Sequence, residues 1–153
     1  MAIILSILAL VALDQGSKLL VLDRLKGQAD RIIIEDFFRL RYVENRGAAF
    51  GILQGQRSLF FLVSFVVIAI LIYLLFLRKD PLPRGMTLAL VLVFSGTLGN
   101  LIDRIRLHYV VDFLSFKILG HNFAVFNLAD SFIVVGTFLL LIFIILWDGK
   151  TSE

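Results

Sequence analysis

The chain of 153 residues contains no cysteine, and only two of its residues are histidines. The absence of cysteine excludes a disulfide framework, a thiol nucleophile and a cysteine-ligated metal site. His108 and His121 lie outside the apolar runs, and no HExxH sequence is present. Because catalytic zinc usually takes three protein ligands, we expect no metal site. We also expect no cofactor.

Charged residues are also scarce. They make up 18% of the chain, whereas 59% is hydrophobic; an ordinary soluble domain carries roughly 25% charged residues. Long windows carry no charge, which indicates one integral-membrane domain over residues 1–153. The formal charge of +3 fits arginines flanking membrane spans, and the absence of a basic stripe with interleaved aromatics argues against nucleic-acid binding.

Crossing the hydrocarbon core as a helix takes about 20 mostly apolar residues. The first candidate span lacks a basic start and carries an acid and a lysine, so we expect a retained helix rather than a cleaved signal peptide. The four predicted spans cover about residues 2–22, 58–77, 86–105 and 125–147.

The links between these spans differ in character. The first contains RIIIEDFFRLRYVEN, whose β-branched and aromatic residues predict short strands. The second link, RKDPLPRG, is short, and the third, about residues 106–124, is long enough to hold a small structure. Both long links must lie on the same side of the membrane. The total number of Lys and Arg residues would place the two long links in the cytoplasm, whereas the density of these residues would place the short link there. The distribution of charge therefore leaves the orientation open.

Each ionisable residue at the bilayer centre costs about 2.5–3.5 kcal/mol on insertion scales, so each needs a reason to be there. Asp14 and Lys18 are four residues apart and share a helix face, and we interpret them as a structural ion pair.

One face of the third span also collects small and polar residues. In SGTLGNLIDRI, two glycines, Asn100 and Asp103 recur at helical spacing. Small residues let helices approach closely in lipid, and the amide can bond to a neighbouring helix. This face is either a packing seam or the lining of a polar cavity, and the spacing alone does not separate the two.

Two further acids fall near one membrane face. Asp112 follows the third span, Asp130 lies just inside the fourth, and Asn127 shares a helical face with Asp130. Two carboxylates within hydrogen-bond reach share a proton, so one can activate a water while the other protonates a carbonyl group. The alternative is that Asp112 is a solvated loop acid and Asp130 caps the fourth helix, and spacing leaves both interpretations open.

Five short strings together resemble the lipoprotein signal peptidases (signal peptidase II), a family of small bacterial intramembrane aspartyl peptidases. They occur in the order found in that family, and they extend over essentially the whole chain. The strings are DQGSK in the first span, NRGAAFG at residues 45–51, GNLIDR at 99–104, VVDF at 110–113 and FNLADS at 126–131.

The resemblance implies a role for each polar position. The catalytic acids fall on Asp112 and Asp130. The positions that would bind the substrate or support the site are Asn45, Gly47, Asn100, Arg104 and Asn127. The positions implied to be structural are Asp14, Lys18 and Asp103.

The resemblance also implies an all-α membrane protein with four transmembrane helices and a small extracytoplasmic β-cradle. Such a protein lies in the bacterial cytoplasmic (inner) membrane, with cytoplasmic termini and the active site near the extracytoplasmic face. Its partners would be membrane lipids and prolipoproteins, cleaved before a cysteine that bears diacylglycerol, and we expect a monomer. Two alternatives from the residues alone are a small transporter or proton relay that uses the buried acids, and a scaffolding subunit that uses the glycine face.

Overall fold

The structure is a computed structural model that describes residues 1–47 and 56–151. Within these residues, four helices are long and apolar enough to cross a membrane, as the sequence predicts. The helices are α1 (Ala2–Arg24), α2 (Arg57–Ile72) with a π-helical continuation η2 (Tyr73–Leu77), α3 (Arg84–Leu107) and α4 (Leu128–Thr151).

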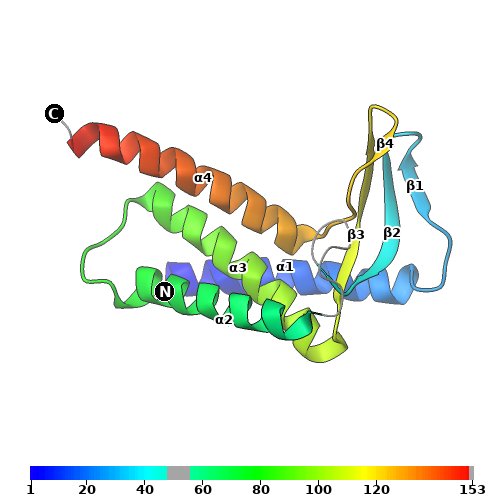
Figure 1. Cartoon of the computed structure of the whole chain (residues 1–153), viewed down its shortest axis with the longest axis horizontal. Helices are drawn as coiled ribbons and strands as arrows, with labels where there is room; N and C mark the ends of the chain where they lie inside the picture. The colour runs from blue at the N-terminus through cyan, green and yellow to red at the C-terminus, as the bar shows by residue number, and fades with distance from the viewer. Residues whose placement is uncertain (48–55, 152–153) are drawn as a thin grey trace.

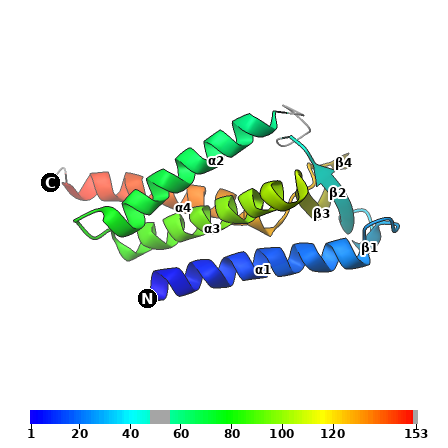
Figure 2. The ribbon, with the colours of Figure 1, turned by 90° about the horizontal axis from the view of Figure 1, so that it is seen from below.

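The central helix is α3, which packs against α1, α2 and α4 (Figures 1 and 2). In its most apolar window 61% of the residues are buried, against 17% in α1 and 11% in each of the other two. The other three helices therefore turn most of their apolar side chains outward. A soluble protein seldom exposes so large a contiguous apolar surface, whereas a membrane protein presents it to lipid.

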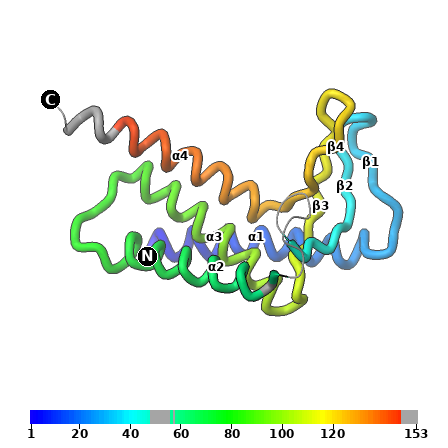
Figure 3. Tube along the Cα trace, viewed as in Figure 1, coloured from blue at the N-terminus to red at the C-terminus, as the bar shows by residue number. Residues whose placement is uncertain are grey.

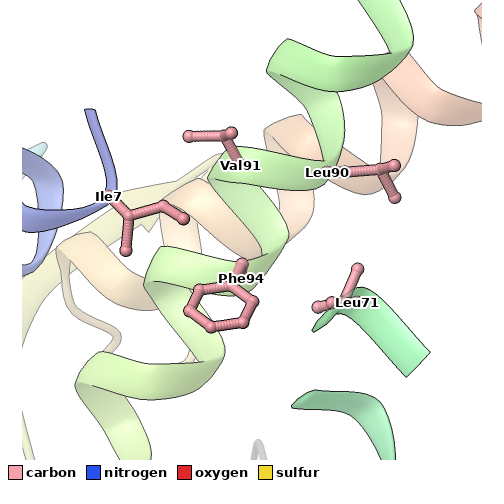
Figure 4. Close-up of a cluster of buried hydrophobic side chains, with 5 residues drawn as sticks. All are labelled: Ile7, Leu71, Leu90, Val91 and Phe94. Atoms are coloured by element: carbon pink, nitrogen blue, oxygen red, sulfur yellow. The ribbon is translucent and has the colours of Figure 1, made fainter. Parts of the chain in front are cut away.

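The interior of the bundle is aliphatic and aromatic. Side chains from α1, α2 and α3 converge in one buried cluster, formed by Ile7, Leu71, Leu90, Val91 and Phe94 (Figure 4). Because lipid is as apolar as these side chains, close packing rather than the hydrophobic effect holds such helices together.

The glycines of the third span answer part of the question that spacing left open. A Cβ atom added to Gly96 would overlap the backbone carbonyl of Ala129 on α4, and one added to Gly99 would overlap the Asp14 carboxylate on α1. This face of α3 is therefore a packing seam at both glycines, where the absence of a side chain lets α1 and α4 approach α3.

The two long links build one antiparallel sheet with the strand order β1-β2-β3-β4. The strands predicted in RIIIEDFFRLRYVEN form and pair with each other, and the second of them also pairs with a strand of the third link, which confirms that both links lie at the same end of the bundle. The strands are β1 (Arg31–Ile34), β2 (Phe38–Asn45), β3 (Val110–Ile118) and β4 (His121–Asn122).

The sheet projects from one end of the bundle, whereas α1 begins and α4 ends at the opposite end (Figures 1 and 3). Side chains from the end of α1 and from β3 bury one another, among them Val21, Leu25 and Val111. At the same junction the Tyr42 and Tyr109 hydroxyls lie 3.0 Å apart. These contacts fix the base of the sheet on α1, and the base of the sheet carries Asp112.

Candidate active site

Asp112 lies near the start of β3 and is 1% exposed. Its strand pairs with β2 so that Val43 faces Asp112 and Asn45 faces Val110. Asn45 is thus a diagonal neighbour of Asp112, within reach of a long side chain, and its Nδ2 donates to Asp112 Oδ2 at 2.8 Å. The interpretation of Asp112 as a solvated loop acid is therefore wrong.

Asp130 lies in the first turn of α4, where it takes part in a reciprocal capping arrangement. Asn127 Oδ1 accepts the backbone N–H of Asp130 at 2.9 Å, and Asp130 Oδ2 accepts the backbone N–H of Asn127 at 3.2 Å. The N-cap is therefore Asn127, and Asp130 occupies the third helical position of a capping box. This cap explains why α4 begins at Leu128, about three residues after the predicted start of the span.

Two buried asparagines connect the acids. Asn127 Nδ2 donates to Asp112 Oδ1 at 2.7 Å and to Asn100 Oδ1 at 3.2 Å. Asn100 Nδ2 in turn donates to Asp130 Oδ1 at 2.7 Å. In each amide the NH₂ group donates to a carboxylate and the oxygen accepts from an N–H group. Rotating either amide by 180° would therefore break the hydrogen bonds of both its nitrogen and its oxygen. The two acids are held in one continuous hydrogen-bond network.

The electrostatics of the site favour a proton on Asp112 near neutral pH. Burial raises the pKa of Asp112 to about 7, and the nearby Asp130 charge adds to this rise. The amides of Asn45 and Asn127 act in the opposite direction, because they donate to the ionised form, but they do not offset the loss of hydration. A carboxyl group that keeps its proton at this pH can act as a general acid.

Both acids line a cavity of about 560 Å³ between α3, α4 and the sheet. The Arg104 guanidinium lies on its wall, 5.0 Å from the centre of the Phe60 ring. Most of the remaining wall is apolar. The apolar side chains come from the segment before α4 and from its first turns, among them Phe123, Val125, Phe126, Ile133 and Val134. A ligand with both a polar backbone and an apolar part matches this lining.

A second buried cluster lies behind the acids. Lys18 Nζ is 3.0 Å from both Asp14 Oδ2 and Asp103 Oδ2, which confirms the predicted Asp14–Lys18 pair and adds the third member. Gln15 was not singled out from the sequence, yet its Nε2 donates to Asp103 Oδ1 at 3.0 Å and to the Gly99 carbonyl at 3.1 Å. The available signals were that Gln15 interrupts the apolar first span and stands inside the DQGSK string.

The structure therefore brings together the residues singled out for the site. Asn45, Gly47, Asn100, Arg104, Asp112 and Asp130 all line the cavity, and Asn127 lies behind it. Of the NRGAAFG string, residues 48–51 lie outside the described part of the chain. No group of three or more His, Asp or Glu side chains placed to hold a metal ion occurs among residues 1–47 and 56–151.

Comparison with known proteins gives extensive matches. The sequence profile of Signal peptidase (SPase) II matches residues 6–146. A lipoprotein signal peptidase from Halothermothrix orenii is 47% identical over 94% of both chains. Proteins of the same name from Clostridioides difficile and Clostridium tetani are 44% and 42% identical, over 99% and 97% of this chain and 99% and 95% of their own lengths.

Solved structures agree with the sequence matches. A bacterial membrane enzyme solved by the in meso method at 2.3 Å resolution superposes with a TM-score of 0.85 at 32% identity, over 99% of this chain and 92% of its own. A second one, solved at 1.9 Å, gives 0.82 at 34% identity, over 94% and 92%. From its profile match, its near full-length relatives and its fold, the chain belongs to the signal peptidase II family.

Proposed function

We propose that the chain is an intramembrane aspartyl endopeptidase that removes the signal peptide from diacylglyceryl-modified prolipoproteins, cleaving before the lipidated cysteine. The name of the relatives, lipoprotein signal peptidase, supports the substrate class. The catalytic type rests on one observation. Asp112 and Asp130, from different elements, line the same cavity and are joined through Asn127 and Asn100.

In the proposed mechanism, Asp130 begins as the carboxylate and Asp112 as the acid. Asp130 takes a proton from a water molecule, whose oxygen attacks the scissile carbonyl carbon, while Asp112 gives its proton to the carbonyl oxygen. In the second half, Asp130 passes its proton to the leaving nitrogen as the C–N bond breaks, and Asp112 recovers a proton from the geminal diol. Both acids return to their starting states, so the cycle closes.

The supporting residues divide by what they touch. Asn45 and Asn127 hold the two oxygens of Asp112, and Asn100 holds Asp130. The Asn45 side chain is itself fixed, because its Oδ1 accepts the backbone N–H of Gly47 at 3.0 Å. Arg104, on the cavity wall, is assigned to the substrate backbone, whose carbonyl oxygens accept hydrogen bonds from a guanidinium.

The lipid part of the substrate would lie along the apolar wall that α4 presents to the cavity. In this proposal, the whole chain is one peptidase domain that contacts membrane lipids and works as a monomer. The sheet and the site lie at the extracytoplasmic face, so the opposite end, where α1 begins and α4 ends, lies in the cytoplasm. Asp112 follows the end of α3 and Asp130 lies in the first turn of α4, so both acids lie at the end of a membrane-spanning helix, which supports cleavage at a membrane boundary.

The function is tested with the purified protein and two synthetic precursors, one carrying diacylglycerol on its cysteine and one unmodified. We expect cleavage of the first, immediately before the cysteine, and at least a ~100-fold lower kcat/KM for the second, because the apolar wall is then left unfilled. Equal cleavage of both precursors would contradict the substrate assignment. Proton flux through liposomes without any cleavage would favour a proton relay.

A further inference from the structure

Three charged side chains lie buried behind the proposed catalytic acids and take no part in the mechanism. Lys18 is 2% exposed, Asp103 1% and Asp14 0%. The ammonium of Lys18 has three hydrogens and three partners at 3.0 Å, namely Asp14, Asp103 and Asn100 Oδ1. We refer to Asp14, Lys18 and Asp103 as the buried triad. Its formal charge, counting both acids as carboxylates, is −1.

Stability alone gives a weak reason for such a triad. Replacing a buried ion pair by apolar side chains of similar volume is often neutral or stabilising, because burial costs each ion its hydration. This cost is larger still within a membrane, where ionisable residues tend to mark a functional site. The triad therefore needs a function, and its contacts indicate which.

Each acid of the triad holds the backbone next to one proposed catalytic acid. Asp14 Oδ1 accepts the backbone N–H of Ala129 at 3.0 Å, one residue before Asp130. Asp103 Oδ2 accepts the backbone N–H of Val111 at 3.1 Å, one residue before Asp112. Lys18 bridges the two carboxylates, so the start of α4 and the start of β3 are tied together through a single ammonium group.

A second connection runs through a side chain. Lys18 Nζ donates to Asn100 Oδ1, and this forces the amide NH₂ of Asn100 toward the Asp130 carboxylate, 2.7 Å away. If the amide were reversed, two donors would face each other at Lys18 and two acceptors at Asp130. The orientation of the Asp130 carboxyl group thus depends on the position of Lys18.

We propose that the buried triad is a positioning device that sets the spacing and orientation of the Asp112 and Asp130 carboxyl groups. This inference rests on the function proposed above. Asp112 belongs to strand β3 and Asp130 to helix α4, and the triad links both of these elements to α1 and α3. Lys18 is its central positioning residue, although it touches neither substrate nor water in the mechanism.

Two variants distinguish the effect of losing the Lys18 bridge from the effect of changing the charge of the triad. Lys18→Met removes the bridge and changes the formal charge of the triad to −2. The double variant Asp14→Asn/Lys18→Met also removes the bridge, but it restores the charge to −1 and keeps an amide oxygen for the backbone N–H of Ala129. The matched control is Lys117→Met, because Lys117 forms an ion pair with Asp36 at 2.7 Å at the exposed end of the sheet, away from the cavity.

We expect kcat to fall about 100-fold in both triad variants, because a displacement of about 1 Å between reacting groups is sufficient for such a loss. The value of KM should stay within about threefold of the original, since the triad does not line the cavity. Lys117→Met should leave both constants unchanged. A purely structural role would lower the fraction of folded enzyme without changing kcat per folded molecule.

The pH profile gives a second readout. The charged groups around the Asp112 carboxyl are Asp130 on α4, Arg104 on α3 and Lys18 on α1, and Lys18 lowers the pKa of Asp112. Asp103 accepts the backbone N–H of Val111, the residue before Asp112. The side chain that β2 places against the Asp112 carboxyl is the uncharged Asn45. Loss of Lys18 should therefore move the alkaline limb of kcat/KM to higher pH, and the double variant should move it back while kcat stays low.

The proposal is overturned if the folded double variant retains kcat within about threefold of the original protein. It is equally overturned if neither triad variant folds, because the triad would then serve structure alone. Folding is measured by thermal unfolding in detergent. An Asp112→Asn variant run alongside separates the two claims: full activity there would reject the proposed dyad, whereas an inactive Asp112→Asn with a fully active double variant would reject only the positioning role.

Discussion

Replacing Asn127 by alanine removes two separable functions of one buried side chain. Its Oδ1 caps α4 through the backbone N–H of Asp130, and its Nδ2 joins Asp112 to Asn100. Loss of a helix N-cap costs about 1 kcal/mol. Loss of a hydrogen bond to a charged group costs about 1.5–3 kcal/mol. We therefore expect Asn127→Ala to lower the free energy of unfolding by about 3 kcal/mol.

Serine at this position separates the two functions. Its hydroxyl can still cap α4, but it is too short to reach Asp112 and Asn100 together. We expect Asn127→Ser to recover about 1 kcal/mol of the lost stability, while kcat remains about 100-fold below that of the original protein because the acids are no longer joined.

The assays are thermal unfolding of the detergent-solubilised protein and cleavage of the lipidated precursor. For a chain of this length, 3 kcal/mol corresponds to a fall in Tm of about 6–12 °C. Full activity of Asn127→Ser would refute the connecting function of the amide. An unchanged Tm in Asn127→Ala would refute the capping argument.

Three further predictions follow from single contacts. Because Asp112 must hold its proton and its pKa is about 7, kcat/KM should fall about tenfold per unit above that pH; a flat pH–rate profile up to pH 9 would contradict its role as the acid. Gly96→Ala should lower Tm, because its Cβ meets the Ala129 carbonyl at a cost of about 1–3 kcal/mol, whereas Gly16→Ala, which meets nothing within 4 Å, should not. Arg104→Gln should raise KM about tenfold through one lost charged hydrogen bond to the substrate, and an unchanged KM would remove Arg104 from substrate binding.

Much of the fold can be read from the sequence because lipid imposes simple rules. Twenty apolar residues in a row have few options other than a spanning helix, and all four spans form close to their predicted places. The strands of the first long link, β1 and β2, also follow from local residue preference, whereas β3 and β4 were not predicted. The pairing of the strands does not follow from the sequence, because β2 and β3 are separated by two spans. Nothing in either strand specifies the register that places Asn45 diagonally opposite Asp112.

The site was predictable in its residues rather than in its connections. Helical periodicity placed Asn127 beside Asp130. The alternative interpretation, which rested on the preference of Asp for helix N-termini, made Asp130 the cap of α4, whereas in the structure the N-cap is Asn127. The bond from Asn100 to Asp130 and the bond from Lys18 to Asn100 both join different helices. Spacing within one helix carries no information about such contacts, so these links required the structure.

The central claim is that Asp112 and Asp130 together hydrolyse the peptide bond. The most direct test measures cleavage of the diacylglyceryl-modified precursor by Asp112→Asn and Asp130→Asn, with Asp36→Asn as the control because Asp36 is exposed at the far end of the sheet. We predict folded proteins with no detectable cleavage for the two site variants and unchanged cleavage for the control. Cleavage at the original rate by either site variant would contradict the account.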